Sequence, residues 1–296
     1  MLELRPEQKK GVLSMIALRK GLALVFLILA APATAEPASD AAISAFVDNH
    51  SAVTRLGKIA RWEEGVCPGV TGLPAGFSKY ILKRVRDVAT AAGAPVNADE
   101  SCKANIDIVF TTKPQGLLDS IRIKDPFLLG YFDSGAQADE MAKVSRTIQA
   151  WHATQTVDAR GHALVDSRNN AAGGTAQTSN AQNSLGNRLG DGLHSSYFHA
   201  IIVADPGKLG DYEIGTLADH IAMLALAQPA AQEACGELPS ILDMTSAQCH
   251  KDAPAKTMTA ADTGYLRGLY QADPGASLRT QKDGIAFRVK DTLAGH

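Results

Sequence analysis

Apolar and polar residues follow two different periods along this chain, and the change of period predicts helices and strands in mixed order. Apolar residues spaced three or four apart predict a helix over residues 79–92, ended by Gly93. A dense run of β-branched residues predicts a buried strand over residues 104–111. Two further strands are predicted over residues 147–157 and 197–204, the first followed at once by a hairpin turn and a short return strand.

The second half of the chain contains the most apolar helical pattern. Residues 217–228 are almost entirely apolar and predict a long buried helix, and Thr216 is its predicted N-cap. Thr259 and Asp262 have the spacing of a capping box and predict a helix over residues 260–271. We expect this helix to be the last element of the fold.

The order of these elements predicts an α+β fold, in which a long central helix packs under a mixed β-sheet. We expect a single domain over residues 36–296. Residues 169–183 contain no large apolar side chain and cannot bury enough surface to offset the entropy of ordering them. This segment is predicted to be a flexible surface loop within the domain.

The N-terminus has the three parts of a secretory signal peptide. Arg19 and Lys20 precede an apolar run over residues 21–31, and a small-x-small cleavage motif ends at Ala35. We therefore expect residues 1–35 to be removed and the protein to be periplasmic or extracellular, although a retained N-terminal anchor is the alternative. After cleavage we expect no transmembrane anchor, because no later apolar run approaches the roughly 20 residues that a spanning helix needs.

Charge and cysteine content narrow the class of protein to which the chain can belong. The chain has 29 basic and 31 acidic residues and no basic run, which argues against nucleic acid as a partner. An even number of cysteines in an exported chain predicts disulfides, and we favour the pairs Cys67–Cys102 and Cys235–Cys249 because each brackets one structural unit. A four-thiolate zinc site is disfavoured because the chain has no C-x-x-C pair.

Three segments, taken in order, resemble the active-site half of matrixin-type (metzincin) zinc peptidases. They read TLADHIAMLAL over residues 216–226, PSI over 239–241 and MTAADTGYLRGLY over 258–270. They correspond to the zinc-binding helix, the methionine-turn region and the following helix of those enzymes, and they also resemble a family of uncharacterised exported bacterial proteins. The resemblance implies a zincin-like fold for this chain.

The chain departs from the peptidase pattern where the chemistry takes place. Ala218 and Ala222 stand at the positions of the first two zinc-binding histidines, and Asp219 stands at the position of the glutamate. Catalytic zinc needs three protein ligands and an open position, so the resemblance implies a shell without zinc or another cofactor. We therefore expect a pseudoenzyme that binds a peptide or a cell-envelope protein, with a groove along residues 197–204.

The alternative hypothesis is an active hydrolase or metallopeptidase with relocated ligands or a metal-free mechanism. Asp219 and His220 are its candidate catalytic residues, and His199 is a further candidate ligand if folding brings it close to them. Asp219 also has a simpler explanation, as an acid in the first turn of its helix. Trp62 and Trp151 are candidates for lining a groove, although core packing is the stronger expectation for both.

Overall fold

The computed structural model describes most of the chain after the predicted signal peptide. The predicted signal peptide (residues 1–35) and the predicted flexible loop (residues 169–183) both lie outside the described residues. The described ranges are 38–166, 192–230, 235–246, 249 and 254–295.

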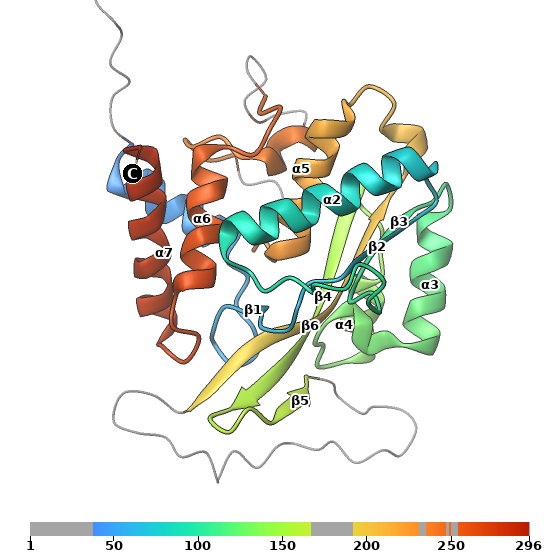
Figure 1. Cartoon of the computed structure of the whole chain (residues 1–296). Helices are drawn as coiled ribbons and strands as arrows, with labels where there is room; N and C mark the ends of the chain where they lie inside the picture. The colour runs from blue at the N-terminus through green and yellow to red at the C-terminus, as the bar shows by residue number, and fades with distance from the viewer. Residues whose placement is uncertain (1–37, 167–191, 231–234, 247–248, 250–253, 296) are drawn as a thin grey trace, which may run out of the picture. The chain divides into compact units, whose positions relative to one another are not determined.

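The centre of the fold is a mixed β-sheet of six strands with the order β2-β3-β6-β4-β5, in which β1 also pairs with β6 (Figure 1). Strands β1 and β3 run parallel to β6, and β2 runs parallel to β3. Strand β4 runs antiparallel to both β6 and β5. The prediction of an α+β fold with a mixed sheet is confirmed. The strands are β1 Arg61–Trp62, β2 Pro68–Thr71, β3 Ile106–Phe110, β4 Ile148–Asp158, β5 Ala163–Val165 and β6 Leu193–Ala204.

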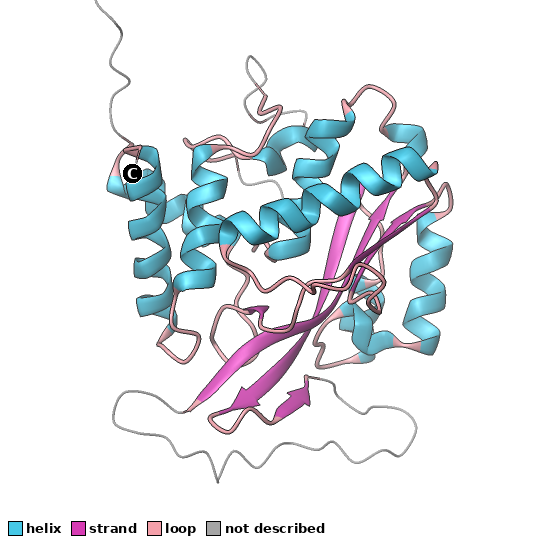
Figure 2. Ribbon diagram, viewed as in Figure 1, coloured by secondary structure: helices cyan, strands magenta, loops and turns pink. Residues whose placement is uncertain are grey.

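Helices cover both faces of the sheet unequally (Figure 2). Alternate residues of β6 divide between the two faces: Ile202 packs into a large core, and Ile201 packs into a smaller one. The large core is closed by helices α1 Asp40–His50, α2 Ala75–Ala92, α5 Ile214–Leu226, α6 Ala260–Gln271 and α7 Leu278–Leu293. On the opposite face lie α3 Pro114–Lys124, the 3-10 turn η1 Pro126–Leu129 and α4 Gly135–Met141.

Helix α5 is the long central helix that the sequence predicts, and all its residues from Thr216 to Leu226 are buried. The helix begins three residues earlier than predicted: the N-cap is Glu213, and Thr216 lies inside the helix. The Thr216 hydroxyl instead donates a hydrogen bond to the carbonyl of Lys256, at 2.7 Å. Thr216 therefore fixes the segment that passes over the helix and does not cap it.

The C-terminal end of α5 is buried, so its free carbonyls need donors from other elements. Three consecutive carbonyls each accept one side-chain hydrogen bond. His152 Nε2 on β4 bonds the carbonyl of Leu224, Trp62 Nε1 on β1 donates to that of Ala225, and the Tyr270 hydroxyl on α6 donates to that of Leu226, each at 2.8 Å. The core position of Trp62 is confirmed, and its indole also ties the sheet to the helix.

Two helices differ from the prediction. Helix α2 begins at Ala75, four residues earlier than predicted, with Pro74 at its N-cap; Ser78 lies inside the helix, and its hydroxyl donates to the carbonyl of Leu73. Helix α7 was not predicted, because only a few of its residues are buried. It packs closely on α6: a Cβ at Gly268 of α6 would lie 2.7 Å from the Cα of Ile285. This close approach requires glycine at position 268.

Two disulfides join Cys67 to Cys102 and Cys235 to Cys249, which are the pairs favoured from the sequence. Each closes a loop, and loop closure of this length stabilises a fold by roughly 3–4 kcal/mol in the chain-entropy model. Disulfides persist in oxidising compartments, so they indicate a location outside the cytoplasm. Within the described residues, no helix combines the length and apolar character that crossing a bilayer requires.

The first prediction concerns His152, whose Nδ1 has no hydrogen-bond partner among the described residues and whose pKa is lowered by burial to about 4. In the unfolded chain the ordinary pKa is 6.5, so the unfolded state binds more protons between these values. The contribution of neutral His152 to the free energy of unfolding is therefore fully present above about pH 6.5 and is lost as the pH falls towards 4. We expect His152 to account for a loss of about 2 kcal/mol in the free energy of unfolding between about pH 8 and about pH 5.

The substitution His152→Gln keeps an amide donor near the carbonyl of Leu224 but cannot titrate. Urea unfolding of both proteins across this pH range measures the difference, and the variant should have the flatter profile. Identical pH profiles for the two proteins would contradict the role assigned to His152.

Candidate functional site

The two alanines at the presumed metal positions lie in a packed interior. Ala218 and Ala222 are each 0% exposed and belong to the large core between α5 and the surrounding elements. Histidine side chains would not fit at either position without displacing the core. In the described part of the chain, no group of three or more His, Cys, Asp or Glu side chains could hold a metal ion.

Asp219 and His220 are neighbours on α5 but face different elements, since successive helix residues point about 100° apart. Asp219 pairs with Nε of Arg84 on α2, and its second oxygen accepts the N–H of Met258 at 2.8 Å. His220 Nδ1 bonds the carbonyl of Ile241 at 3.0 Å, and burial lowers its pKa to about 4. The fold therefore does not combine these two side chains into one catalytic pair.

Two further expectations about this region are corrected. Asp219 is the sixth residue of α5 and therefore lies beyond the first turn. Its carboxylate is stabilised by the ion pair with Arg84 and not by the helix N-terminus. His199 lies on β6 with Nε2 at 3.2 Å from the Asp107 carboxylate on β3, and it is not gathered with Asp219 and His220.

The groove expected along residues 197–204 is absent, because these residues belong to β6 in the middle of the sheet. One edge of β6 pairs with β1 and β3, and the other edge pairs with β4. An added peptide strand needs a free sheet edge, which β6 does not offer. Trp151, considered as a groove residue, is buried in the smaller core.

A serine, a histidine and a carboxylate also meet inside the large core. The Ser240 hydroxyl lies 3.0 Å from His50 Nε2 and donates to Asp262 at 2.6 Å. Burial lowers the pKa of His50, while the Asp262 carboxylate opposes that shift. All three side chains are buried, and Ser240 donates to the carboxylate, so no substrate reaches a hydroxyl activated by the imidazole. The cluster instead joins α1 to α6 through Ser240.

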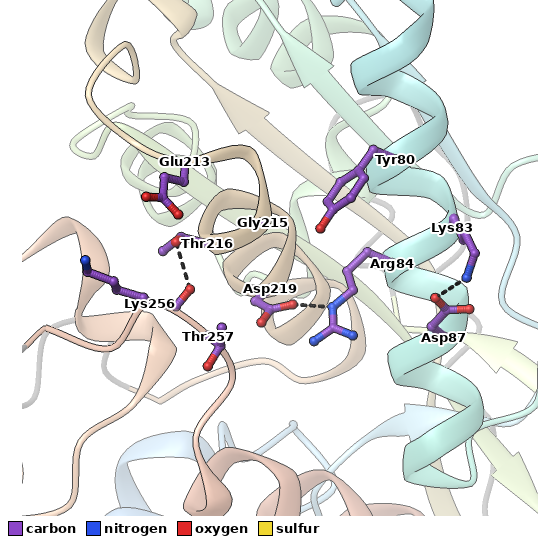
Figure 3. Close-up of a pocket in the computed structure, with 10 residues that line it drawn as sticks. All are labelled: Tyr80, Lys83, Arg84, Asp87, Glu213, Gly215, Thr216, Asp219, Lys256 and Thr257. Carbon is purple, nitrogen blue, oxygen red and sulfur yellow. Dashed lines mark hydrogen bonds and ion pairs between the residues drawn. The ribbon is translucent and has the colours of Figure 1, made fainter.

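An open groove lies between α2, α5 and the segment that precedes α6 (Figure 3). Its volume is about 370 Å³. The Arg84–Asp219 ion pair crosses its floor, with Asp219 buried and the Arg84 side chain 37% exposed. The other polar side chains that line it include Tyr80, Lys83, Asp87, Glu213, Lys256 and Thr257.

Electrostatically, the groove combines both signs of charge. Lys83 pairs with Asp87 across one helix turn at 2.6 Å, and both side chains are largely exposed. The hydrogen bond from Arg84 to Asp219 raises the pKa of the guanidinium, so Arg84 stays charged. Its Nε is engaged by Asp219, and its two Nη atoms make no hydrogen bond to another described residue. Figure 3 shows these Nη atoms turned away from the carboxylate.

A smaller hollow of about 160 Å³ adjoins this groove and shares Arg84 and Asp87 with it. Its remaining lining is mainly apolar and includes Val88, Ala92, Met258 and Leu266. At the other end, the half-exposed Phe77 and Tyr80 continue the same face of α2. We call the two hollows and this face together the α2 groove.

The chain matches no protein-family model, no curated protein and no solved structure. The resemblance to matrixin-type peptidases therefore stays a prediction, and the candidate site rests on geometry. Sequence reasoning missed Arg84, because its partner Asp219 is 135 positions away in the chain. The available signal was its place on α2, one turn after Tyr80 on the polar side of the helix.

The second prediction concerns Asp219, which holds both Arg84 and the N–H of Met258. Asp219→Ala leaves two buried or half-buried donors without an acceptor, and we expect the free energy of unfolding to fall by about 2–3 kcal/mol. Lys83→Met is the control, because breaking an exposed i,i+4 pair costs less than about 0.5 kcal/mol. Urea unfolding measures both changes, and equal small losses would contradict this role of Asp219.

Proposed function

We propose that the protein is a non-catalytic binding protein of the periplasm or the extracellular space, and that it binds a peptide or an extended segment of a cell-envelope protein in the α2 groove. The observation that carries the proposal is the α2 groove itself, an open surface whose one buried carboxylate is used to position Arg84. A carboxylate held in this way serves as a support for the arginine and is not available as a general base.

The dimensions of the groove favour an extended ligand. From Phe77 to Ala91 the helix face is about 21 Å long, at 1.5 Å per residue. An extended peptide of about six residues has the same length. Aromatic side chains at one end, paired charges in the middle and an apolar hollow at the other end suit a chain of varied side chains better than a compact metabolite.

The pseudoenzyme interpretation belongs to this proposal. The three segments that resemble matrixin-type peptidases pack against one another here: His220 of the first bonds the carbonyl of Ile241 in the second, and the Ser240 hydroxyl of the second donates to Asp262 of the third. Such packing agrees with descent from a zincin-like shell. The buried alanines at positions 218 and 222 agree with the loss of its metal.

The alternative, a hydrolase that uses Asp219 and His220, has less support. Each of the two side chains already has a partner from a different element, and His220 is buried and neutral at ordinary pH. General acid–base catalysis needs both groups within reach of one substrate atom.

The third prediction tests binding by screening a peptide library against the purified mature chain. We expect selected peptides to bind the wild type and to lose most of their affinity for the Phe77→Ala/Tyr80→Ala double variant, because those rings form one end of the groove. The matched control is Ile123→Ala, since Ile123 is an apolar residue of α3 that is 80% exposed.

Mass spectrometry of the same peptides after prolonged incubation should find them intact. Cleavage at defined bonds would favour the hydrolase instead. Peptides that bind equally well to the double variant would show that the α2 groove is not the binding surface.

A further inference from the structure

Arg84 differs from the two lysines of the groove in how it is held. Its Nε is fixed by Asp219, which is itself fixed by the N–H of Met258, so the guanidinium has a set position. Lys83 is 76% exposed and pairs only with a neighbouring exposed carboxylate. A guanidinium held at Nε can still offer its two Nη atoms, which form the fork that a carboxylate accepts in two parallel hydrogen bonds.

The Arg84–Asp219 pair is neutral as a whole, so directed hydrogen bonds, and not an excess of positive charge, select the ligand. A carboxylate fits the two Nη donors better than a phosphate does, because a doubly charged group would be repelled more strongly by the carboxylate of Asp87, which lines both hollows with Arg84. One planar, singly charged anion is therefore the favoured chemistry at this point.

Directly beside the guanidinium lies the apolar hollow formed by Val88, Ala92, Met258 and Leu266. Burying an apolar side chain there would remove its surface from water and so favour binding. A ligand that uses both features must carry a carboxylate and an apolar group close together. In a peptide, the last residue meets this condition, because its carboxylate and its side chain leave the same Cα atom. An internal Asp or Glu places its carboxylate at the end of its own side chain, so an apolar group must come from a different residue and does not share its Cα atom.

We propose that the α2 groove recognises the C-terminus of a peptide that ends in an apolar residue. The terminal carboxylate binds the Nη atoms of Arg84, the last side chain fills the apolar hollow, and the preceding residues run along α2 towards Tyr80 and Phe77. This inference rests on the function proposed above and names the part of the ligand that the groove reads.

The fourth prediction uses N-acetylated hexapeptides that end in leucine, prepared as free acids and as C-terminal amides, with binding measured by calorimetry. We expect the amide to bind at least about tenfold more weakly than the acid, because it loses charge-assisted hydrogen bonds to the guanidinium. Arg84→Lys should weaken binding of the acid to a similar degree, since lysine keeps the charge but not the fork. Affinity that does not differ between acid and amide would overturn the inference.

A second variant tests the hollow without disturbing the Arg84–Asp219 pair. Ala91 is exposed and lines the hollow, so Ala91→Trp should cover it and weaken binding of the leucine-ended acid, again by about tenfold. The matched control is Thr90→Trp, because Thr90 is also exposed on α2 but does not line the hollow. Equal affinities of the two variants would overturn the assignment of the hollow to the last side chain.

Two further comparisons distinguish failure of this inference from failure of the proposed function, and a peptide ligand from a small carboxylate. Hexapeptides that bind equally as acids and amides, and lose binding in the Phe77→Ala/Tyr80→Ala variant, would overturn the C-terminal inference and leave the proposed function standing. Absence of any peptide binding that depends on the groove would overturn both. N-acetylleucine or hexanoate that binds as tightly as the hexapeptide acid would show that the site reads a small carboxylate and not a peptide end.

Discussion

The burial of helix α5 from Thr216 to Leu226 is the constraint on which the rest of this structure depends. A helix that is surrounded by protein leaves its terminal carbonyls and its polar side chains without water, and each unpaired group costs about 1–3 kcal/mol. The fold meets this demand with side chains from outside the helix. His152, Trp62 and Tyr270 satisfy three terminal carbonyls, and Arg84 satisfies Asp219. The sheet, α2 and α6 are therefore held around α5 by specific hydrogen bonds as well as by apolar packing.

The same constraint produces the candidate site. Asp219 is buried and needs a cation, so it fixes one edge of the Arg84 guanidinium and leaves the other edge facing the groove. Ala218 and Ala222 are fully buried on the same helix, and their small side chains allow α5 to pack closely against the surrounding core. One helix thus carries both the small residues that allow close packing and the buried carboxylate that fixes Arg84.

Asp262 has a comparable role at the edge of the core. Its carboxylate accepts the N–H groups of Thr259 and Ile241 and the hydroxyl of Ser240, so it caps the start of α6 and fixes the 3-10 turn η4 Ile241–Thr245. Hydrogen bonds from backbone N–H groups stabilise a carboxylate in place of water. This arrangement sets the position of the segment over residues 254–258, which forms one wall of the α2 groove.

Local sequence determined those features whose cause lies within a few residues. Helix α6 begins and ends where its capping box and period predict, Gly93 ends α2 in a left-handed conformation, and β3 follows its β-branched run. Only the tertiary structure decided that Arg84 meets Asp219, that β6 has no free edge and that α7 covers α6. The physical reason is the range of the interactions: a cap or a period acts over three or four residues, whereas the partners of a buried polar group come from wherever the packed chain places a donor.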